Sequence, residues 1–242
     1  MSEKKIALIT GANKGLGFET ARQLGRKGFT VLVGARDETR GATAVEKLKA
    51  EGFVADFIKL DATDAETIKN AAQTLSEKYG KLDVLVNNAG IALDGGEKPS
   101  EVSPDLLRRT FDTNFFGVIA VTQAFLPLIK KSASGRIVNV SSGLGSLTQN
   151  SDPNWNFYDV KPLAYNASKT ALNAFTVILA HELKDTSIKV NSADPGYTAT
   201  DLNGNTGPKT VAEGASIITD LATLDENGAT GGYFDDQGVL PW

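Results

Sequence analysis

The chain has 242 residues, with no cysteine, one histidine and one methionine. The absence of cysteine excludes a disulfide framework and a thiolate metal site, and it is consistent with a reducing compartment. No group of histidine and carboxylate residues has the spacing of metal ligands, so we expect no bound metal. The lone histidine, His181, lies outside every motif described below, and we give it no catalytic role.

An excess of positive charge is also missing. Lysine and arginine number 25 against 29 aspartates and glutamates, for a net charge of −4. A protein that binds nucleic acid through phosphate contacts needs a surplus of cations, so we expect no nucleic-acid partner. The apolar run at residues 6–9 is too short for a signal sequence or a membrane span. We therefore expect a soluble, cytoplasmic protein with no membrane partner.

Short apolar runs that alternate with helical stretches are the main pattern in the chain. Hydrophobic residues make up 41 %, enough for a substantial core. The expected strands are Ile6–Thr10, Thr30–Gly34, Phe53–Leu60, Val84–Val86, Ile137–Val140, Ile188–Ala193 and Gly232–Phe234. The expected helices are Phe18–Lys27, Thr39–Glu51, 64–79, Pro104–Lys130, 164–184 and Thr210–Leu224. This alternation predicts right-handed βαβ units and a parallel sheet covered on both faces. No linker divides the chain, so residues 1–242 are expected to form a single domain.

A glycine-rich turn follows the first expected strand. The run is Thr10-Gly-Ala-Asn-Lys-Gly-Leu-Gly17, between a strand and a helix. In that context backbone N–H groups can approach a pyrophosphate at the N-terminus of the helix. The spacing is one residue longer in its first gap than the usual dinucleotide fingerprint. The alternative interpretation is a tight turn between strand and helix that binds nothing.

The end of the second strand indicates which dinucleotide would bind. A unit that binds NAD usually has a carboxylate here for the ribose 2′-hydroxyl. This chain has Ala35 followed by Arg36, and Lys14 lies in the glycine-rich turn. Two cations suit a 2′-phosphate, which predicts NADP(H) in preference to NAD(H). Asp37 would weaken this preference if its side chain turned inward.

Tyr165 and Lys169 lie four residues apart, in Ala-Tyr-Asn-Ala-Ser-Lys at 164–169. That spacing places a phenol and an ammonium on one face of a helix. A charge about 4 Å away is worth roughly 4 kcal/mol at an effective dielectric near 20, or about three pKa units. The pKa of the phenol would then fall from about 10 to near 7. A phenol with that pKa is a general acid/base for a carbonyl oxygen, although the spacing alone is weak evidence.

Six motifs in order resemble the short-chain dehydrogenase/reductase family. They are Thr10–Gly17, Asn87-Asn-Ala-Gly90, Asn114, Ser142, Tyr165 with Lys169, and Pro195-Gly196. The resemblance covers essentially the whole chain. It implies an α/β fold: a single Rossmann domain with a doubly wound parallel sheet of about seven strands, helices on both faces and a nicotinamide cofactor.

The resemblance also implies a role for each catalytic residue. Tyr165 would donate the proton, and Lys169 would lower its pKa and hold the ribose hydroxyls. Ser142 would hydrogen-bond the substrate oxygen. Asn114 would bind a water that links Lys169 to solvent. A polar residue in an otherwise apolar helix is the alternative interpretation of Asn114.

Nineteen residues would contact the cofactor if the resemblance holds. Asp61 would meet the adenine, Asn88–Gly90 would pack by the adenosine ribose, and Pro195–Thr198 with Thr200 would flank the nicotinamide. The full set is Gly11, Asn13, Lys14, Gly15, Leu16, Gly17, Arg36, Asp61, Ala62, Asn88, Ala89, Gly90, Tyr165, Lys169, Pro195, Gly196, Tyr197, Thr198 and Thr200.

Further details resemble the carbonyl reductase branch of the family, including Asn13-Lys14 and the ending Pro241-Trp242. A long stretch also separates Ser142 from Tyr165, and we treat residues 143–163 as a substrate-loop insertion. Its aromatic residues would line the substrate pocket together with Ser142 and Tyr165; these are Trp155, Phe157 and Tyr158. The alternative is a surface insertion with its rings packed on the core.

The expected reaction is the reversible, NADPH-dependent reduction of a ketone or aldehyde to an alcohol. Two alternatives stay open: a catalytically silent NADP(H) sensor, and an alcohol dehydrogenase that works mainly in the oxidative direction. Monomer and homo-oligomer also stay open. The long helix has one apolar stripe (Phe111, Phe115, Val118, Phe125) and an uncharged opposite face (Thr113, Phe116, Gly117, Ala120, Ala124). Either a partner subunit or the 143–164 segment could cover that second face.

Overall fold

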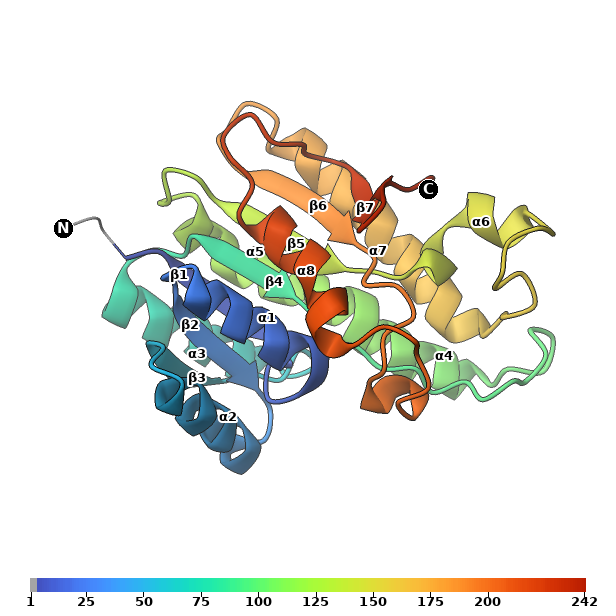
Figure 1. The fold of residues 1–242 in the computed structure, drawn as a ribbon, viewed down its shortest axis with the longest axis horizontal. Helices are drawn as coiled ribbons and strands as arrows, with labels where there is room; N and C mark the ends of the chain where they lie inside the picture. Colours follow the sequence, from blue (N-terminus) through green and yellow to red (C-terminus); the bar gives the residue numbers. More distant parts are fainter. Residues whose placement is uncertain (1–3) are drawn as a thin grey trace.

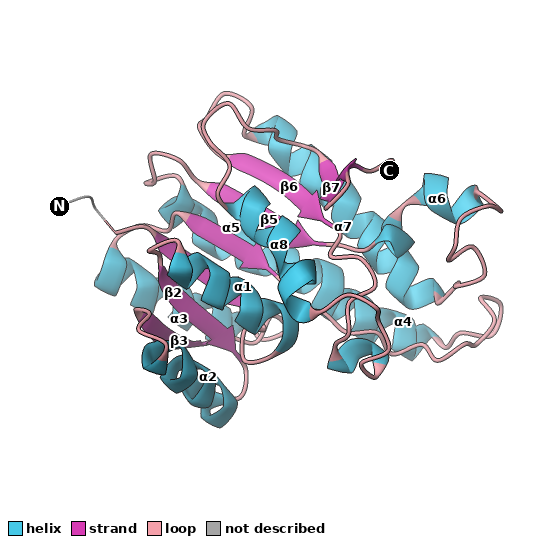
Figure 2. Cartoon of the chain, in the orientation of Figure 1, coloured by secondary structure: helices cyan, strands magenta, loops and turns pink. Residues whose placement is uncertain are grey.

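A computed structural model describes residues 4–242. One eight-stranded sheet runs through the chain in the order β3-β2-β1-β4-β5-β6-β7-β8 (Figures 1 and 2). The strands are β1 Ile6–Thr10, β2 Thr30–Ala35, β3 Ala55–Lys59, β4 Val84–Asn87, β5 Arg136–Val140, β6 Lys189–Ala193, β7 Tyr233–Asp235 and β8 Gly238–Val239. The first seven pair in parallel, and this confirms the predicted sheet.

The eighth strand was not predicted. β8 pairs antiparallel with β7 across a tight turn in which Asp235 Oδ1 accepts from the Gln237 and Gly238 N–H groups. Gly238 has φ +134°, a conformation that favours glycine. A strand of two residues is too short to leave a hydrophobic pattern, so the sequence carried no signal for it.

Helices cover both faces of the sheet. They are α1 Gly15–Arg26, α2 Glu38–Ala50, α3 Ala65–Tyr79, α4 Pro104–Phe111, α5 Gly117–Ile129, α6 Leu147–Ser151, α7 Leu163–Glu182 and α8 Val211–Ala222. In Figure 1, α1 and α8 lie in front of the sheet, with α2 on their side, while α3, α5 and α7 lie behind it. The fold is therefore doubly wound, as expected.

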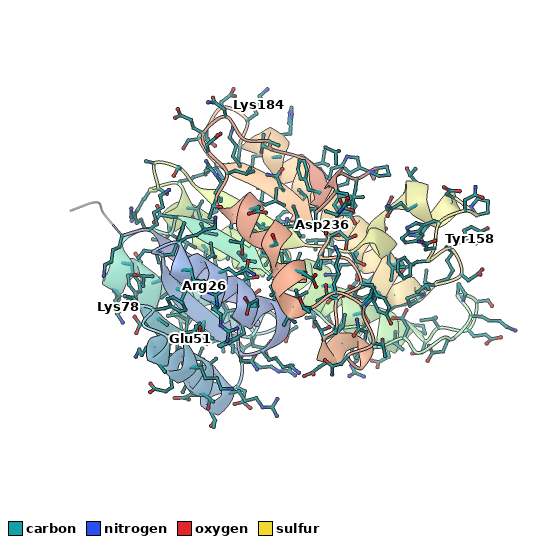
Figure 3. The ribbon with its side chains drawn as sticks, in the orientation of Figure 1. Arg26, Glu51, Lys78, Tyr158, Lys184 and Asp236 are labelled. Carbon is teal, nitrogen blue, oxygen red and sulfur yellow. The ribbon has the colours of Figure 1, made fainter. Side chains whose placement is uncertain are left out.

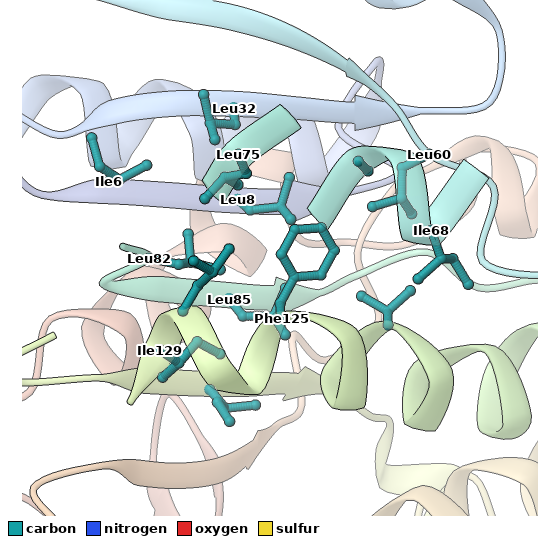
Figure 4. Close-up of a cluster of buried hydrophobic side chains, with 14 of the residues drawn as sticks. Ile6, Leu8, Leu32, Leu60, Ile68, Leu75, Leu82, Leu85, Phe125 and Ile129 are labelled. Carbon is teal, nitrogen blue, oxygen red and sulfur yellow. The ribbon is translucent and has the colours of Figure 1, made fainter. Parts of the chain in front are cut away.

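Alternate side chains of each strand serve the two faces, because successive residues of a strand point to opposite sides. On β1, Leu8 packs in one cluster with Phe125 of α5 (Figure 4). Its neighbour Ile9 packs in the other cluster with Leu24 of α1 and Ile218 of α8. Apolar residues at consecutive positions are what a parallel sheet buried on both faces requires.

The long helix predicted at Pro104–Lys130 is interrupted. A π-helical turn at Asp112–Phe116 joins α4 to α5. Within residues 4–242, Pro104–Ile129 is the one helical stretch long and apolar enough to cross a membrane by length and composition alone, and its Phe125 is fully buried in the core. The uncharged face of this stretch is buried at some positions and exposed at others. Phe116 is 57 % exposed. Gly117 is closely packed, because a Cβ there would lie 2.6 Å from the Ala62 carbonyl oxygen.

Candidate functional site

A cleft of about 1310 Å³ lies at the carboxyl ends of the strands. The strand order reverses between β1 and β4, which is where α/β sheets of this kind bind ligands. Every residue predicted to contact the cofactor lines this cleft, and so do Ser142, Trp155 and Phe157. The structure therefore brings together segments that lie up to about 190 positions apart, from the glycine-rich turn at 11–17 to Thr200.

The glycine-rich turn has the shape of a phosphate-binding loop. Gly11 and Gly15 have φ of +64° and +57°, in the left-handed region that favours glycine. A Cβ on Gly17 would lie 2.5 Å from Asn88 Nδ2 and 2.7 Å from the Gly11 carbonyl oxygen, so only glycine fits. α1 begins here without a side-chain cap from Lys14, and its first N–H groups are available for an anion.

Asp37 turns away from the cleft. Its carboxylate accepts from the Arg40 N–H at 2.9 Å and caps α2. The arrangement that would have weakened the preference for NADP(H) is therefore not present. Arg36 is exposed and lines the cleft. Lys14 also lines the cleft, but its Nζ donates to Asp201 at 2.6 Å, a contact between residues 187 positions apart that the sequence did not reveal.

Thr10 ties the ends of β1 and β4 together, a role that the sequence analysis missed. Its Oγ1 accepts from the N–H groups of Asn88 and Ala89, each at 3.0 Å. Asn88 Nδ2 donates back to the Thr10 carbonyl at 2.8 Å. These bonds hold the two loops that line the middle of the cleft in a fixed relation.

Ser142, Tyr165 and Lys169 meet at one end of the cleft. Ser142 follows β5, and the other two residues lie one helical turn apart in the first half of α7. The side chains of Ser142 and Tyr165 are hydrogen-bonded. Lys169 is buried; its Nζ donates to the Val140 carbonyl at 2.7 Å and lies 5.6 Å from the centroid of the Tyr165 ring. The predicted grouping of these three residues is present.

The expected pKa of Tyr165 was wrong. Burial raises the pKa of Tyr165 to about 12; the hydrogen bond with Ser142 lowers it, and the Asp194 carboxylate raises it further. Burial also lowers the pKa of Lys169 to about 8. The ammonium bonds to the Val140 carbonyl instead of the phenol, so desolvation outweighs its attraction for a phenolate. Tyr165 is therefore protonated at neutral pH and can act as an acid.

Asn114 lies in the π-helical turn, behind the cleft wall. It is fully buried; its Oδ1 accepts from the Ile91 N–H at 2.9 Å, and its Nδ2 donates to the Ile91 carbonyl at 2.8 Å and to Ser168 Oγ at 3.0 Å. A Cβ on Gly90 would lie 3.4 Å from Asn114 Oδ1 and 3.5 Å from Lys169 Nζ. Asn114 therefore anchors the loop beside the lysine. Its link to solvent through a water stays a prediction.

The 143–163 segment forms one wall of the cleft. It contains a short 3₁₀ turn at Gly143–Gly145 and the helix α6. The rings of Trp155 and Phe157 pack edge to face at 5.5 Å, and Phe157 packs against Tyr197 at 5.8 Å. These three rings connect the segment to the loop after β6.

Tyr158 was expected to line the pocket, and its position corrects this. It lies at the outer edge of the segment, 37 % exposed (Figure 3). Lys161 Nζ lies 4.6 Å from the centroid of its ring. The turn at 155–160 directs Tyr158 to the outside while Trp155 and Phe157 point to the cleft. Sequence position could not distinguish the two directions within one irregular loop.

Asp94 is a site residue that the sequence analysis missed. α7 begins after Pro162, which has no side chain able to cap it. Asp94 Oδ2 instead accepts from the N–H of Ala164 at 2.7 Å and from that of Tyr165 at 3.4 Å. A carboxylate in this position satisfies the first N–H groups and interacts favourably with the helix dipole. Asp94 lies about 70 positions away, so no local pattern could have indicated it.

Replacing Asp94 by alanine should destabilise the start of α7 and misplace Tyr165. We expect a loss of about 0.5–2 kcal/mol in the free energy of unfolding, as for other helix caps, and a several-fold lower kcat. Thermal unfolding and steady-state kinetics measure the two effects. Asp94→Asn keeps an acceptor and should retain most of both. Unchanged stability and kcat in Asp94→Ala would contradict the assigned role.

Comparison with known proteins identifies a family, two relatives and a solved structure that this chain resembles. A sequence model of the short chain dehydrogenase family matches residues 5–210. The chain is 33 % identical to (+)-neomenthol dehydrogenase of Capsicum annuum, over 97 % of this chain and 98 % of that protein. It is 35 % identical to carbonyl reductase (NADPH) 1 of Mus musculus, over 100 % and 99 %. The structure of NADPH-bound carbonyl reductase from chicken fatty liver superposes with a TM-score of 0.86, at 27 % identity and with full coverage of both chains.

Proposed function

Because the chain belongs to the short-chain dehydrogenase/reductase family, we propose that it reduces a small ketone or aldehyde at the cleft, with Tyr165 as the proton donor. The chain is an NADP(H)-dependent oxidoreductase of the carbonyl reductase type. The observation that carries the site assignment is the meeting of Ser142, Tyr165 and Lys169 in the cleft that also contains the glycine-rich turn.

The residues around the cleft fit a dinucleotide phosphate. Two glycines with positive φ and the uncapped start of α1 present N–H groups, and Arg36 supplies a positive charge. When bound, NADPH supplies a hydride for the carbonyl carbon. Ser142 donates a hydrogen bond to the carbonyl oxygen, and Tyr165 transfers its proton to that oxygen as negative charge develops there. Lys169 places a positive charge near the resulting phenolate.

A panel of ketones and aldehydes, run with NADPH and with NADH, tests this function. Oxidation of NADPH that depends on a carbonyl substrate is the expected result. Tight NADPH binding without turnover on any substrate would favour the silent sensor. The complete set of Ser142, Tyr165 and Lys169 argues against that alternative. The oxidative direction uses the same residues, so the ratio of the cofactor's two forms decides the direction in the cell.

The activity should depend on pH through Lys169. Burial lowers the pKa of Lys169 to about 8, so its ammonium is mostly charged at neutral pH and loses the charge as the pH rises through that value. We expect kcat/KM for reduction to be flat around neutrality and to fall above about pH 8. Lys169→Arg remains charged throughout that range, so whatever activity it retains should not show this fall. A wild-type profile that stays flat in alkaline buffer would contradict the assigned role.

Trp155 and Phe157 should determine which substrates are preferred. Truncating a ring that contacts the substrate should cost about 1–3 kcal/mol of transition-state binding for that substrate. Trp155→Ala or Phe157→Ala should therefore change the order of kcat/KM among bulky and small ketones, with NADPH affinity within a few-fold of wild type. Tyr158→Ala, outside the cleft, is the matched control. A fall by one common factor for every substrate would mean that the two rings are structural.

We also propose that the enzyme works in the cytoplasm as a single domain spanning residues 1–242. The lack of cysteine supports a reducing compartment, and the single sheet that includes strands from both halves of the chain supports one folding unit. Its partner would be a small carbonyl compound or the matching alcohol.

A further inference from the structure

The short helix α6, in the cleft wall formed by residues 143–163, has little side-chain packing to hold it in place. None of its residues is buried, and Leu147, its one large apolar residue, is 64 % exposed. The helix nevertheless lies between Leu144 and Trp155, both of which line the cleft. Because apolar burial contributes little here, the position of this part of the wall must depend mainly on hydrogen bonds.

Hydrogen bonds attach both ends of α6 to other parts of the chain. Near its last residue, Asn150 accepts from Lys161 Nζ at 3.1 Å through its carbonyl, and from Asn166 Nδ2 at 3.2 Å through its Oδ1. Near its first residue, the N–H and the Oγ1 of Thr148 donate to the main-chain oxygen of Trp242 at 3.0 and 2.7 Å. The second attachment joins residues 94 positions apart and so depends on where residues 240–242 lie.

Residues 240–242, which follow β8, are themselves fixed on β7. The Leu240 N–H donates to the Tyr233 carbonyl at 2.8 Å. The ring of Trp242 stacks on that of Tyr233, with the centroids 5.4 Å apart and the planes at 17°. Tyr233 is almost completely buried and pairs with Ser192 of β6, whereas Trp242 is 39 % exposed. The stack therefore rests a partly exposed ring on a rigid part of the sheet, at the side of β7 that is nearer to α6 (Figure 1).

We infer that residues 240–242 form a strap that fixes one wall of the substrate cleft, and that Trp242 thereby determines how large a carbonyl substrate the cleft accepts. Among the described residues, Trp242 is not one that lines the cleft. It is a positioning residue that acts through Thr148 on the wall at Trp155. The inference rests on the function proposed above, in which the 143–163 segment borders the substrate.

Two ketones with the same carbonyl surroundings but different size test the strap: cyclohexanone and 4-phenylcyclohexanone. The measurement is kcat and KM with NADPH for wild type, Trp242→Ala and Trp242→Phe. In Trp242→Ala, kcat/KM of the larger ketone relative to the smaller should rise about 3- to 10-fold, the factor for losing one modest hydrogen bond. The reason is that a movable wall holds a small ketone less well and admits a larger one more easily.

The change should appear mainly in KM. Ser142 and Tyr165 lie after β5 and on α7 rather than on the strap, so kcat should stay near the wild-type value. Trp242→Phe keeps a ring that can stack on Tyr233 and should retain the wild-type ratio of the two ketones. A fall in kcat by the same factor for both ketones, with KM unchanged, would contradict the positioning role.

Two further variants separate the strap from a general effect of mutation. Thr148→Val removes one of the two hydrogen bonds to Trp242 and should shift the ratio in the same direction. The double variant with Trp242→Ala should shift it no further than Trp242→Ala alone, because both changes act through one attachment. Val239→Ala is the matched control: Val239 lies on β8, next to the strap, and is 77 % exposed. It should leave the ratio unchanged, and a shift as large as that of Trp242→Ala would count against the strap.

Amide hydrogen exchange tests the strap without relying on activity. In Trp242→Ala, peptides covering residues 146–155 should exchange about 3- to 10-fold faster, while peptides from β1 and α1 keep the wild-type rate. Equal acceleration everywhere would show that Trp242 supports only overall stability, and unchanged exchange at 146–155 would show that it does not hold the wall. Either result would overturn the strap.

The kinetic results distinguish this inference from the proposed function. Reduction of both ketones with a ratio that Trp242→Ala leaves unaltered would overturn the strap as a determinant of substrate size, and the proposed function would stand. Failure of both ketones, and of the wider carbonyl panel, to oxidise NADPH would overturn the proposed function and the role in substrate size with it.

Discussion

Tyr165→Phe is expected to lower kcat for carbonyl reduction by about 10²–10⁴-fold, the usual contribution of a positioned general acid. The phenol is hydrogen-bonded to Ser142, and burial keeps it protonated at neutral pH. Phenylalanine keeps the ring and removes only the proton donor. Binding of NADPH, measured by titration of the purified variant, should remain close to that of wild type.

Tyr158→Phe is the matched control for this substitution. It also removes a phenolic hydroxyl, but from a ring at the outer edge of the 143–163 segment (Figure 3). Its kcat should equal that of wild type. Turnover by Tyr165→Phe near the wild-type value would reject Tyr165 as the acid, whereas a loss of NADPH binding in the same variant would show that the hydroxyl mainly supports the cofactor site.

Arg36→Ala is expected to weaken NADPH binding by about 10- to 100-fold, because a charge-assisted hydrogen bond is worth roughly 1.5–3 kcal/mol. NADH binding should change much less, since only NADPH carries the 2′-phosphate. Lys14→Ala should show a smaller loss than Arg36→Ala, because the Lys14 ammonium already has Asp201 as a partner at 2.6 Å. Dissociation constants of NADPH and NADH, measured for each variant, show whether Arg36→Ala loses more NADPH affinity than Lys14→Ala.

Arg40→Ala controls for a general loss of positive charge. Arg40 lies on α2 and pairs with Asp37 at 3.6 Å, away from the cleft. It should change neither dissociation constant more than a few-fold. Equal losses of NADPH and NADH affinity in Arg36→Ala would show that this cation does not distinguish the 2′ position, and the choice of cofactor would then need another explanation.

The sequence by itself determined the layered fold and the main parts of the site. Consecutive apolar residues such as Leu8 and Ile9 mark strands buried on both faces, and this pattern is local. The glycine-rich turn, the Ser142 position after a strand and the spacing of Tyr165 and Lys169 are local too. Because parallel strands carry their loops at one edge, these separate motifs had to meet in a single cleft.

Only the tertiary structure decided how charged and buried groups are paired. Asp94 caps α7, and Lys14 bonds to Asp201, across chain separations that leave no local pattern. The pKa of Tyr165 depends on burial, which outweighs the charge four residues away. Asp37 turned outward because the start of α2 needed an acceptor. Hydrogen-bond partners and desolvation depend on the three-dimensional surroundings of a group, whereas strand and helix patterns depend on residues that are neighbours in the sequence. For this reason the sequence predicted the fold and the site motifs, but not the ion pairs, the helix cap or the pKa of Tyr165.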